Sequence, residues 1–214
     1  MMDRWSRLSW LTGVVFVALL VASFSVSGNS PGSDESGAKV ISFYRDHQNA
    51  QRASAILGAL AVVFFLFFAG ALREHLRGSD RASGLATTGF GGAVLIAVGG
   101  ASFSGFSFAL ADVPDKLSPA AAQALNLLSN DFFFPFVTGV AVFAIASGLA
   151  ITRYALLPRW LGWVALLIGV VAVTPIGFFS FFALMAWVLV VSILVFVRLG
   201  RSLPATGAAP PQTA

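Results

Sequence analysis

The chain has 214 residues, of which 57% are hydrophobic and only 10% are charged. A soluble domain carries about 25% charged residues, so this composition excludes an ordinary water-soluble fold and predicts that much apolar surface faces lipid. The absence of cysteine excludes disulfides, thiolate metal sites and cysteine nucleophiles. The net charge of +4 is too small and too dispersed to indicate nucleic-acid binding.

Residues 1–27 combine a short basic start with an apolar run over residues 11–26. That run is near the lower limit of the ~20 residues that a membrane-spanning helix needs. Two interpretations are open: a retained first transmembrane helix, or a signal peptide cut after Ser27, where small residues occupy the positions that cleavage requires. The rest of the topology is the same in both cases.

Residues 28–52 are predicted to form an extracytoplasmic loop that contains an amphipathic helix. Residues 28–37 are flexible by composition. Val40, Ile41, Tyr44 and His47 then follow at the spacing of one helix face. We expect this helix to lie on the membrane surface or to extend the next span into water.

Residues 53–197 are predicted to form a bundle of five further spans. In the second span, residues 53–72, we expect the small residues at the start to pack and the later phenylalanines to face lipid. The third span, residues 85–111, has no charge and is expected to be the central helix. Ser118 and Pro119 predict the start of a second surface helix, with Leu125 and Leu128 on its apolar side. Asp131 is expected to stabilise the N-terminus of the fourth span, residues 132–152.

Small side chains predict the contacts between these helices, because close backbone approach is how helices associate in lipid. The third span carries such residues at every fourth position, a row that winds around the helix because four residues advance ~400°. The fifth span, about residues 160–174, carries a second row. The predicted packing residues are Gly89, Ala93, Ala97, Ala101, Gly105 and Ala109 in the first row and Gly162, Ala165, Gly169 and Ala172 in the second.

One helix over residues 160–197 would be ~57 Å long, nearly twice the apolar core of a bilayer. The chain must therefore turn, and the Thr-Pro-Ile-Gly sequence at residues 174–177 is expected to form the turn before the sixth span. Residues 198–214 are predicted to be a disordered cytoplasmic tail.

Arginine placement predicts the orientation. The N-terminus, residues 73–84, residues 153–159 and the tail hold nine of the 13 cationic residues, whereas the other side holds six of the nine acidic residues. The positive-inside rule places the arginine-rich side, with both termini, in the cytoplasm. The expected fold is an all-α polytopic bundle in the bacterial cytoplasmic membrane. It has six transmembrane helices, or five if the first is a cleaved signal, and two short extracytoplasmic surface helices.

The sequence predicts no catalytic residue, metal site or cofactor. The spans carry no ionisable residue near the membrane centre, which disfavours a proton-coupled transporter. His47 and His75 are expected on opposite sides of the core, about 30 Å apart, so they cannot share a metal or haem.

Candidate ligand or partner residues form two groups. A lid made of the two surface helices is expected to bring together two sets of residues: Tyr44, Arg45, Asp46, His47 and Arg52 on one side and Asp112, Asp115 and Asp131 on the other. The alternative is a set of solvated charges. Within the bundle, Ser102 and Ser104 are candidates for a polar patch facing a small cavity. The alternative is that each hydroxyl bonds the carbonyl four residues back in its own helix.

The segment LLPRWLGWVALLIGVV, with YRDHQNAQRA leading into a phenylalanine-rich span that ends in ALREHLR, resembles small multi-pass membrane proteins of the actinobacterial type. The resemblance implies a cytoplasmic-membrane location and no particular activity. The expected function is that of a non-enzymatic accessory or interaction protein, acting through helix packing and the lid. Its partners would be the lipid bilayer and another membrane protein or a second copy. The alternative is a facilitator or binder of a small apolar or lipid-like ligand within the bundle, and a membrane enzyme is third.

Overall fold

The computed structural model describes residues 8–78, 80–131 and 133–201, and over these residues the chain is helical, without strands. An all-α fold is therefore confirmed. The helices are α2 (Leu11–Ser27), α3 (Gly37–Asp46), α4 (Gln48–Leu76), α5 (Ser83–Asp112), α6 (Pro119–Asp131), α7 (Phe134–Tyr154), α8 (Arg159–Ala172) and α9 (Phe179–Arg201), with short 3-10 turns at η1 (Asp80–Ala82) and η2 (Pro114–Lys116).

Four helical stretches are long and apolar enough to cross a membrane, which suggests membrane association. They are Gln48–Leu76, Asp80–Asp112, Pro119–Tyr154 and Phe179–Leu199. Helices α2 and α8 are apolar but shorter, with 17 and 14 residues. Because α8 covers only ~21 Å at 1.5 Å per residue, six spans stay a prediction.

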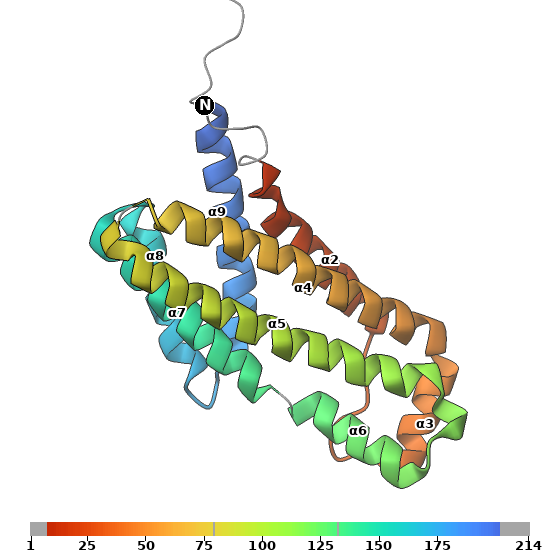
Figure 1. The fold of residues 1–214 in the computed structure, drawn as a ribbon. Coiled ribbons are helices and arrows are strands. Elements are labelled where there is room, and N and C mark those ends of the chain that lie inside the picture. Colours follow the sequence, from red (N-terminus) through yellow and green to blue (C-terminus); the bar gives the residue numbers. More distant parts are fainter. Residues whose placement is uncertain (1–7, 79, 132, 202–214) are drawn as a thin grey trace, which may run out of the picture.

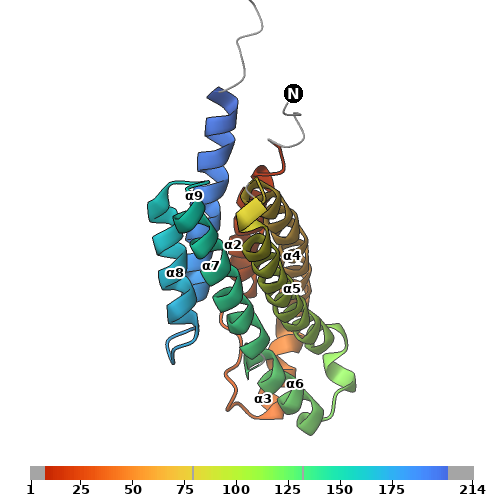
Figure 2. The same cartoon turned by 60° about the vertical axis from the view of Figure 1, so that its left-hand side comes forward.

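The long helices form a ring in which each helix runs antiparallel to the one before it (Figures 1 and 2). Helices α2, α4, α5, α7 and α8 are neighbours in that order, and α9 closes the ring by packing against both α8 and α2. The predicted central helix α5 lies between α4 and α7. Helices α3 and α6 lie together across one end of the ring.

The two ends of the ring differ in charge. At one end, which we call the arginine end, Trp10, just before α2, packs edge-on against His75 of α4, and His75 Nε2 lies 3.2 Å from the Leu156 carbonyl oxygen. This end carries Arg73, Arg77, Arg81, Arg153 and Arg159. The other end, the cap end, is covered by α3 and α6. Arg4 and Arg7 lie outside the described residues.

The predicted row of small residues on α5 packs over only half its length. Gly89, Ala93 and Ala97 are buried, whereas Ala101, Gly105 and Ala109 are exposed. The prediction is wrong for the second half because a strict four-residue row rotates by ~40° per step and has turned ~200° between its first and last members. The buried face instead advances in steps of three and four, and it includes Gly92 and Gly99, which contact the α7 backbone.

The second predicted row is confirmed. Gly162, Ala165, Gly169 and Ala172 of α8 are all buried, and α8 packs there on α7. A methyl group added at Gly162 would lie 2.9 Å from the Gly148 carbonyl oxygen, so the two backbones approach too closely for a larger side chain.

Two other expectations need correction. Phe65 and Phe68 of α4 are buried rather than facing lipid, because their three-residue spacing puts both on the face that packs into the ring, while Phe67 is exposed. The turn at residues 174–177 is present, with Gly177 N donating to Thr174 O over 2.8 Å. Helix α9 then continues to Arg201, so the first four residues of the predicted disordered tail are helical, and residues 202–214 lie outside the described residues.

Candidate functional site

The cap end is built from α3 and α6, which lie side by side. Val40 and Tyr44 of α3 are buried against Leu110, Ala111 and Ala122. Gly37 contacts the Pro119 carbonyl group so closely that no side chain fits between the two helix starts. The predicted pair of short helices over one end of the bundle is therefore present, and its extracytoplasmic location stays a prediction.

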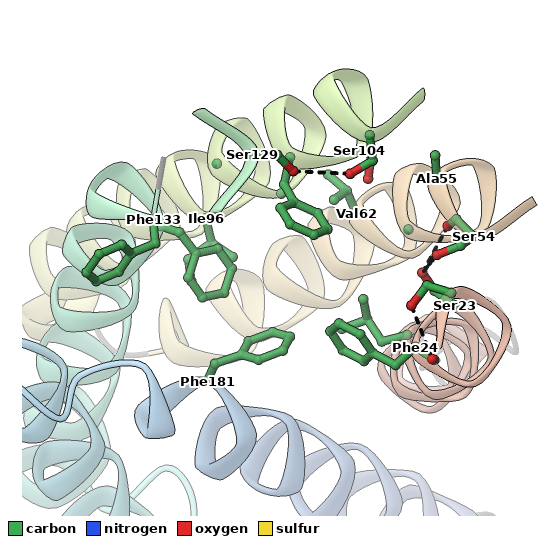
Figure 3. A pocket seen from close by; sticks show the side chains of 18 of the residues that line it. Ser23, Phe24, Ser54, Ala55, Val62, Ile96, Ser104, Ser129, Phe133 and Phe181 are labelled. Carbon is green, nitrogen blue, oxygen red and sulfur yellow. Dashed lines mark hydrogen bonds between the residues drawn. The ribbon is translucent and has the colours of Figure 1, made fainter. Parts of the chain in front are cut away.

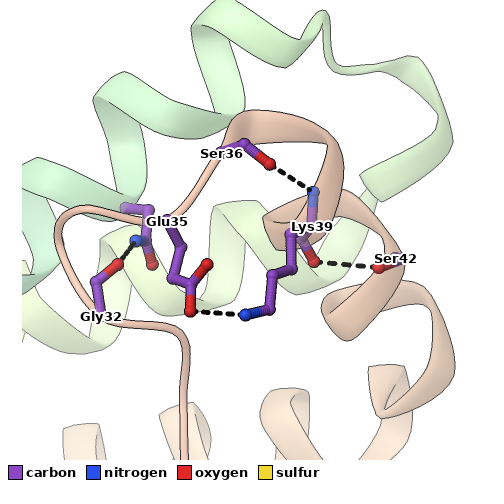
Figure 4. A network of polar contacts seen from close by, with 6 residues as sticks. Gly32, Glu35, Ser36, Lys39 and Ser42 are labelled. Carbon is purple, nitrogen blue, oxygen red and sulfur yellow. Dashed lines mark hydrogen bonds and ion pairs between the residues drawn. The ribbon is translucent and has the colours of Figure 1, made fainter.

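Serine caps fix where both short helices begin. Ser36 Oγ accepts a hydrogen bond from Lys39 N at the start of α3, and Lys39 Nζ pairs with Glu35 over 2.6 Å (Figure 4). Ser118 Oγ accepts from Ala121 N over 3.2 Å, which confirms the helix start predicted at Ser118 and Pro119. Both caps satisfy backbone N–H groups that a helix leaves unpaired at its N-terminus.

The charged residues of the predicted lid mostly pair with one another. Arg52 Nη2 donates to Asp112 Oδ1 over 2.9 Å and to the Asp112 carbonyl oxygen over 2.6 Å, and Arg45 pairs with Asp115. Arg52 therefore satisfies a free carbonyl at the C-terminus of α5, where positive charge is favoured. The solvent-exposed side chain of His47 stacks on Phe43.

Asp131 lies apart from this cluster. It is exposed and is the last residue of α6, whereas α7 begins at Phe134. The expected role at the N-terminus of the fourth span is therefore wrong, because the preceding helix continues through Asp131. Of the predicted lid residues, the structure pairs Arg52 with Asp112 and Arg45 with Asp115, in a structural clasp that joins α3 and α4 to the end of α5 and to η2.

Tyr44 connects the cap to the interior of the bundle. Its ring is 2% exposed, and burial raises the pKa of its hydroxyl above the ordinary 10.0, while a hydrogen bond to Ser107 acts in the opposite direction. Ser107 Oγ in turn lies 3.3 Å from Ser129 Oγ. The Ser107–Ser129 pair thus joins α5 to α6 beneath the cap.

A cavity of about 490 Å³ lies inside the ring beneath the cap (Figure 3). Small-molecule sites in proteins typically have volumes of ~300–1,000 Å³. The cavity is lined by residues of α2, α4, α5, α6, α7 and α9 and of the loop after α2. None of the described lining residues carries a charge.

Most of the cavity wall is apolar. Phe16, Leu20, Phe65 and Ile96 line the part that lies towards the arginine end. At the side, the ring of Phe181 lies 5.1 Å from that of Phe136 and 6.0 Å from that of Phe24. Figure 3 shows the Phe24 and Phe181 rings between α2 and α9.

A second part of the wall, nearer the cap, is polar. Ser23 Oγ donates to Ser54 O over 2.9 Å and lies 3.0 Å from Ser54 Oγ, and Gln51 Nε2 donates to Ser27 O over 2.7 Å. Ser104 is 6% exposed, and its hydroxyl has no hydrogen-bond partner within the described part of the chain.

The structure separates the two serines predicted on the third span. Ser104 lines the cavity, whereas Ser102 is half-buried and does not. Sequence reasoning missed the contributions of Gln51, Ser54 and Ser129. The signal for the first two was their spacing of three, which places both on one face of α4 together with Gly58.

Packed rings close the cavity towards the arginine end. The ring of Phe143 lies 5.7 Å from that of Phe65 and 6.0 Å from that of Trp187, and all three side chains are buried. Trp187 Nε1 donates to the Leu161 carbonyl oxygen over 2.9 Å, which holds the indole in place. The cavity is therefore a pocket with a closed base.

Between α2 and α9 the wall of the cavity includes exposed side chains. These helices pack together near Gly13 and Ser192 and diverge towards the cap end (Figure 1). Where they diverge, the lining side chains of Phe24 and Phe182 are 44% and 48% exposed. The cavity wall therefore reaches the outer surface of the ring at this gap, as it also does at the exposed lining residues Phe103, Phe133 and Phe178.

Neither a metal-binding group nor a related protein points to a function for this geometry. Within the described ranges, no group of three or more histidine, aspartate or glutamate residues is placed to hold a metal ion. Comparison with protein-family models, curated proteins and solved structures finds no match. The resemblance to actinobacterial multi-pass proteins therefore stays a prediction, and the cavity is the feature from which function is inferred.

Proposed function

We propose that this chain is an integral membrane protein of six spans that binds one apolar or lipid-like molecule in the cavity beneath its cap. The observation that carries the proposal is the cavity, whose mostly apolar wall holds a few convergent polar groups. That combination is the usual composition of a small-molecule site. A bundle that acted only as a packing partner would gain stability by filling this space.

Binding fits the cavity better than facilitated passage. A facilitator needs a path through the bundle, and the buried rings of Phe65, Phe143 and Trp187 occupy that path. The hydroxyls of the polar wall lie on the cap side of these rings. The ligand therefore enters and leaves by the same opening.

The position of the opening supports a ligand taken from the bilayer. The outer faces of α8 and α9 expose large apolar side chains, including Trp163, Leu167 and Phe179, each more than 60% exposed. A surface of this kind on a soluble protein would cause association, whereas in a membrane it is the lipid contact. The gap between α2 and α9 would then face acyl chains.

The proposed orientation places the arginine end in the cytoplasm and the cap outside. Arg73, Arg77 and Arg81 on one connection and Arg153 and Arg159 on another support this assignment. In this arrangement α2 is a retained helix, because Ser23 and Phe24 supply part of the cavity wall.

Cavity filling tests the proposal. The protein is extracted in mild detergent, examined by native mass spectrometry for a retained lipid, and labelled with a photoreactive diazirine lipid. Ala55 lines the cavity, whereas its neighbour Ile56 is 50% exposed on the outside of the same helix. We expect Ala55→Phe to lose at least about nine-tenths of the labelling on α2, α4 and α5, and Ile56→Phe to keep it, since a pocket ligand competes for buried space.

A second cavity variant guards against misfolding. Val62 also lines the cavity and is half-buried, so Val62→Phe fills space with less strain. Gel filtration identifies the variants that remain folded. Equal labelling of wild-type protein and a folded cavity variant would refute ligand binding at this site.

A further inference from the structure

We infer that the ligand is an uncharged amphiphile, with a hydroxyl or carbonyl group at one end of an apolar chain, and that Ser104 binds this group. The inference rests on the proposed function and adds the chemical class and orientation of the ligand. Long-chain alcohols and neutral glycerides share the required chemistry.

The polarity of the cavity changes along the axis of the bundle. Phe16, Phe65 and Ile96 line it towards the arginine end, whereas Gln51, Ser54 and the other hydroxyl-bearing side chains line it towards the cap. An apolar chain therefore fits against the closed base, with its polar group under the cap. The reverse orientation would leave the ligand's polar group unpaired among apolar side chains and Ser104 without a partner, which is costly in an apolar environment.

The polar wall is suited to neutral groups only. The described lining residues provide hydroxyls and amides and no charged side chain. Arg45 and Arg52 are the cations of the clasp above, and they already pair with Asp115 and Asp112. A carboxylate or ammonium group in the cavity would thus lose its hydration without gaining an ion-pair partner.

Among the described serines of this wall, Ser104 is the buried one whose hydroxyl has no partner, whereas the unbonded Ser30 is exposed in the loop after α2. Ser23 pairs with Ser54, and Ser107 pairs with Ser129, so these hydroxyls have partners already. The Ser104 side chain is 6% exposed, and its hydroxyl makes no bond in the described residues and lies 2.8 Å from the position that a Cβ of Gly58 would occupy. Glycine at position 58 therefore leaves space in front of it. A serine hydroxyl both donates and accepts, so it can bond an alcohol or an ester carbonyl.

Three diazirine probes of equal chain length test the charge requirement: a long-chain alcohol, the carboxylate and the ammonium, each applied to the full-length protein at a pH where the last two are ionised. We expect the alcohol to label the cavity peptides at concentrations at least about tenfold lower than either ion. If a charged probe labels as well as the alcohol, the inference is overturned while the proposed function stands. If no probe labels wild-type protein more than Ala55→Phe, the proposed function fails.

Paired serine variants test the role of Ser104. We expect Ser104→Ala to weaken labelling by the alcohol about fivefold, the loss of one net hydrogen bond, and to leave labelling by a diazirine hydrocarbon without a polar group unchanged. Ser102→Ala is the control, because Ser102 lies on the same helix outside the cavity. Unchanged alcohol labelling in Ser104→Ala, or an equal loss for the hydrocarbon, overturns the assignment of Ser104.

Discussion

Two adjacent glycines of α5 allow a direct test of how the bundle is held together. A methyl group added at Gly92 would lie 2.9 Å from the Gly139 carbonyl oxygen and from Phe143 Cα, and closer still to Phe143 N. These are backbone atoms of α7, which cannot move without moving the helix. A methyl group added at Gly91 would have no neighbour within 4 Å. Comparing alanine substitutions at the two positions therefore separates the effect of the contact with α7 from the effect of helix propensity.

We expect Gly92→Ala to lower the free energy of unfolding by ~1–3 kcal/mol, the usual cost of overpacking. Separating α5 from α7 by even ~0.5–1 Å forfeits a quarter to a half of the attraction of each atom pair at the contact, and such contacts drive helix association in lipid. Gly91→Ala should raise the free energy of unfolding by up to ~1 kcal/mol, because alanine has a higher helix propensity than glycine.

The assay is reversible unfolding in mixed micelles by titration with a denaturing detergent, followed by circular dichroism. The two variants should differ by ~1–4 kcal/mol, the overpacking cost and the propensity gain acting in opposite directions. If Gly92→Ala is as stable as Gly91→Ala, the close contact of α5 with α7 is refuted.

Other predictions concern topology, a buried hydroxyl and pH. A phosphatase active only outside the cytoplasm should be inactive when fused after Asp80 and active after Lys116, and the opposite result would reverse the proposed orientation. Ser192 is fully buried and its hydroxyl has no partner among the described residues. Ser192→Ala should therefore raise the free energy of unfolding by ~1 kcal/mol in the same micelle titration. A clear decrease in the free energy of unfolding would instead show that the hydroxyl makes a hydrogen bond. Because burial raises the pKa of Tyr44, its stabilising contribution is complete below pH 10.0 and falls as the pH rises further, through the folded-state pKa. Tyr44→Phe should remove this loss of stability above pH 10.0. The measurement is the difference between the ultraviolet titrations of wild type and Tyr44→Phe. If that difference shows a tyrosine whose pKa is not raised, the prediction is wrong.

The helices themselves were predictable from the sequence. Long uncharged runs bounded by arginines and by Gly/Pro turns gave α4, α5, α7 and α9 close to their observed bounds, because length and hydropathy are local properties. The Ser118 cap was predictable for the same reason, since one hydroxyl and the N–H three residues later decide it.

The contact faces of the helices were less predictable. A row of small residues shows that some face packs closely, but the face depends on how the neighbouring helices cross. The fixed four-residue row ended on the exposed side at Ala109, while Gly92 and Gly99, outside the row, make the close contacts with α7. The cavity was less predictable still, because it arises where α2 and α9 diverge, and no local pattern specifies divergence.

Helix α6 shows why sequence patterns mislead at the cap. The sequence pattern assigns Leu125 and Leu128 to an apolar side, yet the buried residues of the helix include Asn126 and Ser129, while Leu127 and Leu128 are each 45% exposed. The buried polar groups have specific partners: Asn126 Nδ2 donates to Gly32 O over 2.8 Å, and Ser129 bonds Ser107 in the cavity wall. Inverted amphipathicity of this kind suits a short helix that lies at a membrane surface over a polar-ended pocket. In the proposed orientation its leucines would face lipid, while Asn126 holds the loop after α2 and Ser129 contributes to the cavity wall.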